Sequence, residues 1–152
     1  MLQTVTPDVN VLLAALRDDH PHHNVARSWL LARLGAAATG EGLTILPMVV
    51  AGVLRVATHP KVFDPPTPPA VVVDFLEKLL ASPGVEYAEL GREWPTLRRF
   101  VREHTARGNE IPDAWIAAAA QTLGVRLVAF DKGLRRYLSA SEFTLLSGSS
   151  IT

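Results

Sequence analysis

The sequence predicts an α/β protein, a three-layer α/β/α sandwich around a mostly parallel sheet. Strand-like and helix-like segments alternate along the chain, and in this pattern the helices connect parallel strands across the faces of the sheet. Segment 126–130 is apolar at successive positions, as expected of a strand buried on both faces. With 152 residues, of which 48% are hydrophobic, the chain suits one domain over residues 1–152 with a sizeable core.

Short apolar segments bounded by turn residues predict the strands. They are residues 2–6, 43–46, 85–88, 126–130 and 143–146. Between them, apolar residues recur at helical spacing, as Val25, Trp29 and Leu30 do in segment 23–34. The predicted helices are 9–17, 23–34, 48–57, 70–81, 94–106, 113–123 and a short one at 133–138. The proline-rich segment 60–69 predicts a surface loop that is too short to separate two domains.

Composition excludes several classes of protein. Cysteine is absent, which removes disulfides, zinc-thiolate sites and a cysteine nucleophile. No apolar run approaches the roughly 18 to 20 residues that span a bilayer, and no leader opens the chain. We therefore expect a cytoplasmic protein that does not contact membrane. We find no spacing typical of a serine hydrolase triad, a phosphate-binding loop or a dinucleotide fingerprint.

Three aspartates are the most informative residues for function. Asp8, Asp113 and Asp131 each lie where the sequence predicts that an apolar strand gives way to a loop or helix. The ends of parallel strands converge at one edge of a sheet, where carboxylates can hold Mg²⁺ or Mn²⁺ against a phosphodiester. Each aspartate alone is equally explained as a helix cap. Recurrence at three positions favours a metal-dependent nuclease.

Basic residues are unevenly distributed although the formal net charge is zero. Between positions 92 and 136 the chain carries nine basic residues: Arg92, Arg98, Arg99, Arg102, Arg107, Arg126, Lys132, Arg135 and Arg136. This segment can contact phosphates, and the alternative is a solvated helix face.

Other residues have two interpretations. His20, His22 and His23 can bind zinc if they converge, although a turn before a helix explains them better. For Trp29, Trp94 and Trp115, packing is expected before base stacking.

The chain resembles the PIN-domain ribonucleases, and among them the VapC toxins of bacterial toxin–antitoxin pairs. The resemblance rests on four segments in order: D-V-N-V-L-L-A-A from Asp8, L-P-M-V-V-A-G-V-L-R-V-A-T-H-P from Leu46, P-D-A-W-I-A-A-A-A-Q-T-L-G-V-R-L-V-A-F-D from Pro112, and K-G-L-R-R-Y from Lys132. It implies an acidic cluster that binds divalent metal, endonucleolytic cleavage of RNA, a small VapB-like antitoxin as partner, and a homodimer.

Asp8, Asp113 and Asp131 match three acids of the family. Two further family acids are replaced, because Gly52 and Gly133 stand at their positions. Glu110 is a candidate to restore a fourth carboxylate, and its alternative is an exposed acid in a helix first turn. We expect Asn10 to orient Asp8 or a metal-bound water.

The resemblance and the acids together predict RNA cleavage that leaves 5′-phosphate and 3′-hydroxyl ends, with Mg²⁺ as cofactor, Mn²⁺ as substitute, and at least one ion bound. Candidate RNA contacts are Arg55, His59, Lys132 and Arg135. Helices 9–17 and 48–57 are candidates for an antitoxin groove, with core packing as the alternative. A different class of function, a PIN-fold binding module that has lost catalysis, is motivated by Gly52 and Gly133.

Overall fold

A five-stranded parallel sheet forms the centre of the protein. The computed structural model describes residues 3–147. The strands are β1 (Val5–Pro7), β2 (Leu43–Ile45), β3 (Val85–Tyr87), β4 (Arg126–Ala129) and β5 (Phe143–Leu145). Their order is β3-β2-β1-β4-β5, and every neighbouring pair is parallel. The predicted α/β/α class is confirmed, and the sheet is parallel throughout its described pairs.

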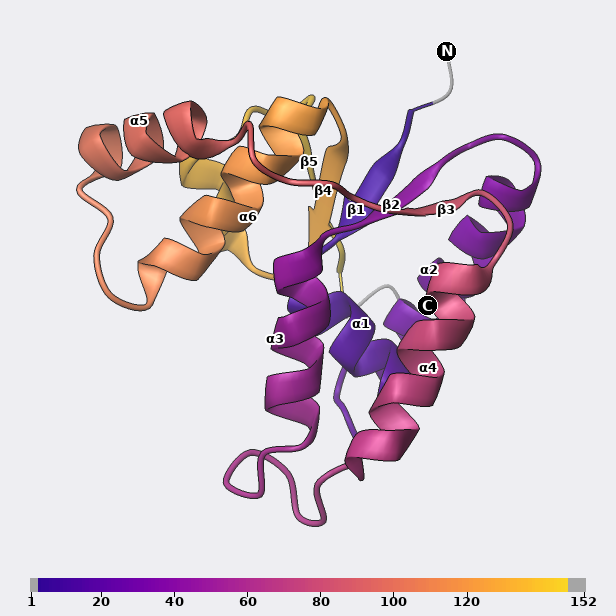
Figure 1. Cartoon of the computed structure of the whole chain (residues 1–152). Coiled ribbons are helices and arrows are strands. Elements are labelled where there is room, and N and C mark those ends of the chain that lie inside the picture. The colour runs from indigo at the N-terminus through magenta and orange to yellow at the C-terminus, as the bar shows by residue number, and fades with distance from the viewer. Residues whose placement is uncertain (1–2, 148–152) are drawn as a thin grey trace.

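Helices connect the strands and cover the sheet (Figure 1). They are α1 (Val9–Leu16), α2 (His23–Ala38), α3 (Pro47–Ala57), α4 (Pro69–Ala81), α5 (Trp94–His104), α6 (Glu110–Leu123) and the 3₁₀ helix η1 (Lys132–Arg136). Helix α5 packs on α6. Within residues 3–147, no helix combines the length and apolar character needed to cross a membrane.

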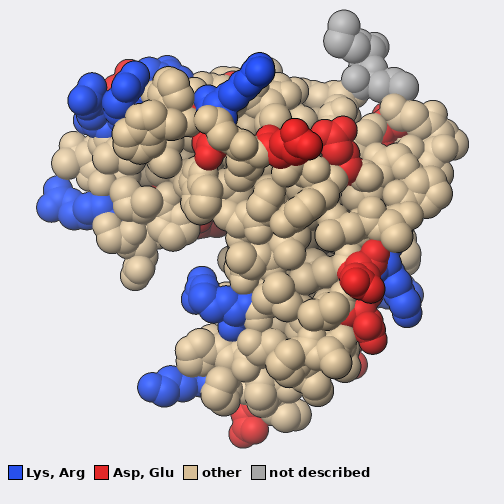
Figure 2. Space-filling model, in the orientation of Figure 1, with Lys and Arg blue, Asp and Glu red and all other residues tan. Residues whose placement is uncertain are grey.

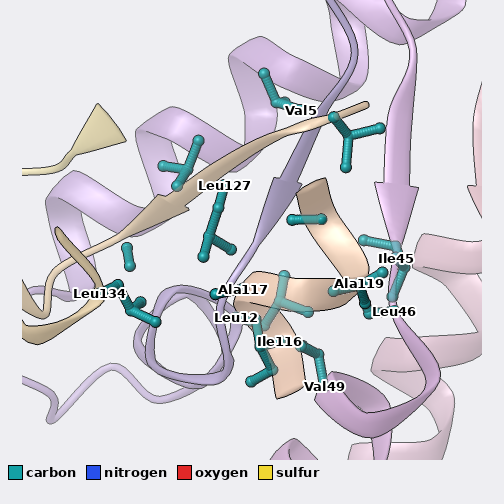
Figure 3. Packing of buried hydrophobic residues seen from close by; sticks show 14 of the residues in the cluster. Val5, Leu12, Ile45, Leu46, Val49, Ile116, Ala117, Ala119, Leu127 and Leu134 are labelled. Atoms are coloured by element: carbon teal, nitrogen blue, oxygen red, sulfur yellow. The ribbon is translucent and has the colours of Figure 1, made fainter. Parts of the chain in front are cut away.

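The core lies between the sheet and its helices (Figure 3). Leu12 of α1, Leu46 before α3 and Leu127 of β4 are fully buried. The alanines of α6 are buried as well, and their small side chains allow this helix to lie close to the strands. The apolar faces of α1 and α3, which the sequence offered as an antitoxin groove, belong to this core.

The observed boundaries differ from the predicted ones at several ends. Strand β1 begins at Val5, later than the predicted 2–6, of which residue 2 lies outside the described residues. Helix α2 continues to Ala38 instead of ending at 34. Helix α6 begins at Glu110, three residues before the predicted start, because Pro112 has no N–H to satisfy and is therefore tolerated in a first turn.

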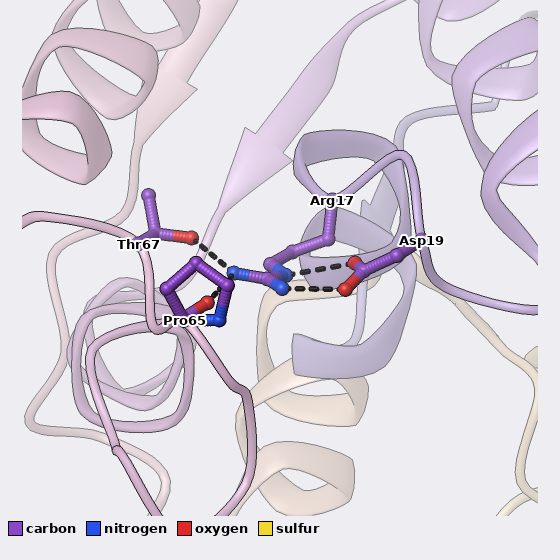
Figure 4. A network of polar contacts seen from close by, with 4 residues as sticks. All are labelled: Arg17, Asp19, Pro65 and Thr67. Atoms are coloured by element: carbon purple, nitrogen blue, oxygen red, sulfur yellow. Dashed lines mark hydrogen bonds and ion pairs between the residues drawn. The ribbon is translucent and has the colours of Figure 1, made fainter.

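Arg17, which follows α1, forms hydrogen bonds to the proline-rich segment (Figure 4). Its guanidinium pairs with Asp19, donates to the carbonyl of Pro65 at 2.9 Å and to Oγ1 of Thr67 at 3.1 Å, and lies 4.0 Å from the ring centroid of Phe63. Its side chain is only 10% exposed. One largely buried cation therefore holds the loop between α3 and α4 in place.

Candidate metal centre at the carboxyl edge of the sheet

Asp8 lies directly after β1, the central strand of the sheet. Its backbone N–H donates to the carbonyl of Val128 in β4 at 2.9 Å, so the sheet fixes the position of the residue. Its Oδ1 accepts a hydrogen bond from the N–H of Val9 at 2.7 Å, which caps α1. Only 5% of Asp8 is exposed, so this carboxylate is held rigidly at the base of the site.

Asp131 follows β4, which pairs with β1, and therefore lies at the same edge of the sheet. Its Oδ1 accepts from the N–H of Gly133 at 2.8 Å and caps η1. Unlike Asp8, it is exposed. The sequence interpretation as a strand-end acid is confirmed for both residues, and each also serves as a helix cap.

Asp113 reaches the site in a different way, and the prediction that it follows a strand is wrong. It is the fourth residue of α6, and the preceding regular element is α5. The helix, and not a strand, brings its half-buried side chain toward the edge where Asp8 and Asp131 lie. Since no hydrogen bond within residues 3–147 uses its carboxylate, both oxygens remain available.

The three carboxylates repel one another electrostatically. Burial raises the pKa of Asp8 to about 6, the hydrogen bond from Val9 opposes this rise, and the charges of Asp113 and Asp131 add to it. Burial and the charge of Asp131 likewise raise the pKa of Asp113. The two pKa shifts and the shared edge of the sheet place the three groups within one another's field, where a cation would relieve the repulsion.

The donor set fits a hydrated divalent cation. Carboxylate oxygens are the ligands that Mg²⁺ prefers, and the ion usually keeps several waters while it binds through one or two carboxylates. Among residues 3–147, no three acidic or histidine side chains stand close enough to enclose a bare ion. Direct binding by one or two aspartates, with water between the ion and the third, is consistent with both observations.

The two glycines at family acid positions have different surroundings. A Cβ at Gly52 of α3 would lie 2.7 Å from Cγ2 of Val9, so Val9 fills the space that a side chain there would need. A Cβ at Gly133 would lie 3.2 Å from Oδ1 of Asp131, the oxygen that the Gly133 N–H already binds. The sequence did not indicate that Val9 packs against Gly52, because the two residues lie on different helices that are distant in sequence.

Glu110 has other partners. Its Oε2 pairs with Nη1 of Arg136 at 2.6 Å, and its Oε1 accepts from the N–H of Arg107 at 3.0 Å. The bond from Arg136 holds the pKa of Glu110 below its usual range. Asn10 is exposed in the first turn of α1, and residues 3–147 offer no hydrogen bond between it and Asp8. Both polar side chains lie near the aspartates in sequence, and within residues 3–147 neither forms a hydrogen bond to them.

The candidate RNA contacts lie on two separate parts of the fold, the end of α3 and the 3₁₀ helix η1. Arg55 is exposed in the last turn of α3, and His59 lies just beyond that helix with its Nδ1 accepting from the N–H of Lys61. Lys132 and Arg135 are exposed in η1, directly after Asp131. Figure 2 shows a hollow between the part of the molecule that contains α6 and the part that contains α3, with basic side chains on the α3 side.

The histidines are engaged with one another and with the protein. His22 stacks on Phe130 with ring centroids 4.5 Å apart, Nδ1 of His20 accepts from the N–H of His22, and Nδ1 of His23 contacts the carbonyl of Ala14 at 2.8 Å. Within residues 3–147 they form no metal-binding group. Trp29 packs against the core as predicted, whereas Trp94 is 58% exposed, which contradicts the packing expectation.

The protein therefore belongs to the class of α/β proteins that carry a cluster of carboxylates at the carboxyl edge of a parallel sheet. The family model for the PIN domain matches residues 5–138. The chain belongs to the PIN-domain family, in its VapC group.

Curated relatives agree in length and sequence. Ribonuclease VapC31 of Mycobacterium tuberculosis is 37% identical over 133 residues, which cover 87% of this chain and 92% of that protein. Ribonuclease VapC43 of the same species is 37% identical over 131 residues, covering 86% and 87%.

Solved structures share the fold at much lower identity. The crystal structure of VapBC2 from Rickettsia felis bound to a promoter DNA fragment contains a chain that matches with a TM-score of 0.65 at 15% identity, covering 95% of this chain and 100% of that one. The structure of FitAcB from Neisseria gonorrhoeae matches with a TM-score of 0.58 at 16% identity, covering 97% and 99%.

Proposed function

We propose that this protein is a metal-dependent endoribonuclease and the toxin of a toxin–antitoxin pair. The observation that carries the proposal is the buried carboxylate of Asp8, which shares one edge of the sheet with Asp113 and Asp131. Burial raises the pKa of Asp8 to about 6 although the Val9 N–H donates to its carboxylate, which supports a site where the charge is only partly compensated. Relatives named ribonucleases across most of the chain support RNA as substrate.

Each aspartate contributes differently to the reaction. Asp8 and Asp131 each have one oxygen bound by a backbone N–H, which leaves the second oxygen for a ligand. Asp113 offers both oxygens. When bound, Mg²⁺ or Mn²⁺ lowers the pKa of a water nucleophile and neutralises charge on the scissile phosphate. The water oxygen would bond to phosphorus as the bond from phosphorus to the 3′ oxygen breaks, and the proton that the water loses balances the one that the 3′ oxygen gains. The products would carry 5′-phosphate and 3′-hydroxyl ends.

We propose that Asp8, Asp113 and Asp131 together hold one ion, one or two of them directly and the remainder through bound water, and we leave Glu110 outside the set. Arg136 and the Arg107 N–H use both of its oxygens, and moving it would break an ion pair. Arg55, His59, Lys132 and Arg135 remain proposed RNA contacts around the site, and Asn10 a proposed partner of a metal-bound water.

Cleavage of mixed total RNA and tRNA tests this function. We expect discrete cuts in Mg²⁺ or Mn²⁺, with 5′-phosphate ends, that disappear in EDTA and in Asp8→Asn and Asp113→Asn. Asp74→Asn is the matched control, since Asp74 is an exposed acid of α4. Equal cleavage by wild type and both site variants, together with no saturable Mn²⁺ binding, would instead support the non-catalytic binding module.

For the antitoxin, the structure offers a groove other than the one predicted. An apolar groove of about 220 Å³ lies between α2 and α4 and is lined by Leu30, Leu31, Leu34, Phe75 and Leu79, with Arg27 and Lys78 beside it. Leu31 is 52% exposed. We propose that an amphipathic antitoxin helix with acidic flanks docks here, and the VapBC2 complex supports such a partner. Loss of co-purification in Leu31→Glu, with RNA cleavage retained, is the expected result.

We also propose that the protein forms a homodimer and acts in the cytoplasm. Light scattering of the purified chain tests the dimer, for which a mass of about twice 16.5 kDa is expected.

A further inference from the structure

One face of α5 carries an aromatic ring and two guanidinium groups that form no ion pair within residues 3–147. Trp94, Arg98 and Arg102 are spaced four residues apart, and residues at this spacing share a helix face. All three are exposed, and Trp94 is 58% exposed. A tryptophan this exposed is unusual in a folded domain. We call these three residues the α5 stripe.

The opposite side of α5 does the packing. Phe100 is buried and contacts Tyr137, with ring centroids 5.3 Å apart. Arg99 donates to Gln121 of α6 at 2.7 Å. The helix is therefore held in place without the α5 stripe, and the stripe is not needed to attach it to α6.

Among residues 3–147, no acidic side chain forms an ion pair with the two arginines of the stripe. Across residues 3–147, the two ion pairs join Arg17 to Asp19 and Arg136 to Glu110. Neither Arg98 nor Arg102 takes part in them, and Figure 2 shows basic side chains gathered over α5. A chain with zero formal net charge thus concentrates unpaired positive charge on one helix face.

The end of α5 that follows the stripe contacts residues close to the acidic site in sequence. At the end of α5, the carbonyl of His104 accepts from Nη2 of Arg136 at 2.9 Å, and the ring of His104 lies 5.1 Å from that of Tyr137. Arg136 belongs to η1, which begins directly after Asp131, and it also pairs with Glu110, three residues before Asp113. From Arg102 to Trp94 the stripe extends about 12 Å away from this connection, at 1.5 Å per residue.

We propose that the α5 stripe is a second contact surface for single-stranded RNA, outside the acidic site. Arg98 and Arg102 bind consecutive parts of the phosphate backbone, and the ring of Trp94 stacks on an unpaired base. Cationic side chains combined with exposed aromatic rings are how proteins bind single strands without reading their sequence. This inference rests on the proposed RNA-cleaving function and assigns the stripe to binding, not to the chemical step.

Binding of a labelled single-stranded RNA 20-mer to the full chain in EDTA tests the proposal by fluorescence anisotropy, because no cleavage occurs without metal. We expect Arg98→Ala/Arg102→Ala to weaken binding at least tenfold and to reduce the salt slope of log K by about 1.4, from roughly 0.7 per phosphate contact. Trp94→Ala should weaken binding by about fivefold or more at an unchanged salt slope, since stacking is worth roughly 1 to 3 kcal/mol.

Matched measurements keep the result interpretable. Lys61→Ala removes an exposed cation of the loop after α3, keeps the backbone N–H that binds His59, and should leave RNA affinity unchanged. Cleavage of a very short oligonucleotide in Mn²⁺ should be equal in wild type and stripe variants, so its loss in all of them would count against the nuclease and not against the stripe. Unchanged affinity and salt slope in both stripe variants would overturn the proposal, as would a change in oligomeric mass without a change in RNA affinity.

Discussion

The neighbouring strands β1 and β2 lead into helices in chemically opposite ways. Asp8 follows β1 and caps α1 with its carboxylate. Leu46 follows β2, makes no side-chain cap, and is succeeded by Pro47 in the first turn of α3. Both helices form, and both junction residues are buried. A helix can therefore start at this edge of the sheet without a carboxylate.

The comparison separates folding from function at the site. Burying a carboxylate is unfavourable unless its charge is compensated, and the Val9 N–H compensates Asp8 only in part, because its pKa remains raised to about 6. Leu46 adds apolar burial instead, which stabilises the fold. We conclude that the β2 junction serves stability, whereas the β1 junction retains a charge that the fold alone does not need.

The sharpest test removes the charge and keeps the cap. Asp8→Asn preserves a side-chain oxygen for the Val9 N–H but loses a metal ligand. We expect RNA cleavage to fall about 10³-fold, equivalent to roughly 4 kcal/mol of activation free energy. Denaturant unfolding in EDTA at pH 7.5 should show equal or greater stability than wild type. A variant that is both unfolded and inactive would mean that Asp8 is primarily a structural cap.

The converse change at the other junction is Leu46→Ala. It empties a fully buried site and should cost about 3 kcal/mol of unfolding free energy, measured by chemical denaturation. Specific activity per folded molecule should stay near wild type. A large loss of specific activity in the folded fraction would erase the distinction between the two junctions.

The free energy of unfolding should depend on pH mainly through the titration of Asp8, at the β1 junction. The pKa of Asp8 rises from its ordinary 3.8 to about 6 on folding, so the folded protein holds this proton more tightly than the unfolded chain. The stabilisation is fully present below about pH 4 and is lost as pH rises through 6, for a decrease of about 2 to 3 kcal/mol without metal.

Unfolding curves in EDTA between pH 4 and 7.5 measure this decrease. Saturating Mn²⁺ should abolish most of it, and Asp8→Asn should keep only the part that arises from Asp113, whose pKa is also raised. Stability that increases with pH over this range in EDTA would contradict the assignment.

The two junctions also meet, because α3 approaches α1 where Gly52 faces Val9. Gly52→Ala brings Cβ to 2.7 Å from Cγ2 of Val9, and such overpacking typically costs about 1 to 3 kcal/mol. In the Val9→Ala background the overlap is removed, because only Cβ of residue 9 remains, at 3.6 Å. The same substitution should then stabilise α3 by about 1 kcal/mol through helix propensity. A double-mutant cycle measures this coupling, and equal effects in both backgrounds would refute it.

The smallest effect is expected at Glu110. Since Arg136 and the Arg107 N–H occupy its oxygens, Glu110→Gln should leave the Kd for Mn²⁺ unchanged in calorimetric titration. Asp113→Asn is the comparison variant and should weaken Mn²⁺ binding at least tenfold. A similar loss in both variants would return Glu110 to the ligand set.

By itself, the sequence determined the layer architecture and two of the site positions. Alternation of apolar strands with amphipathic helices depends on local periodicity, so the parallel sheet and the acids after β1 and β4 could be predicted. The sequence also identified Asp8, Asp113 and Asp131 as candidate site residues, because each lies in a motif whose spacing is local.

Only the tertiary structure decided the remaining features. Asp113 lies within α6 because the helix begins earlier than predicted. Two contacts join segments that are distant in sequence: Val9 with Gly52, and Glu110 with Arg136. Exposure of Trp94 likewise depends on which face of α5 meets α6. Periodicity indicates which residues share a face, whereas packing against other elements determines which face is buried and which charges lie close enough to interact.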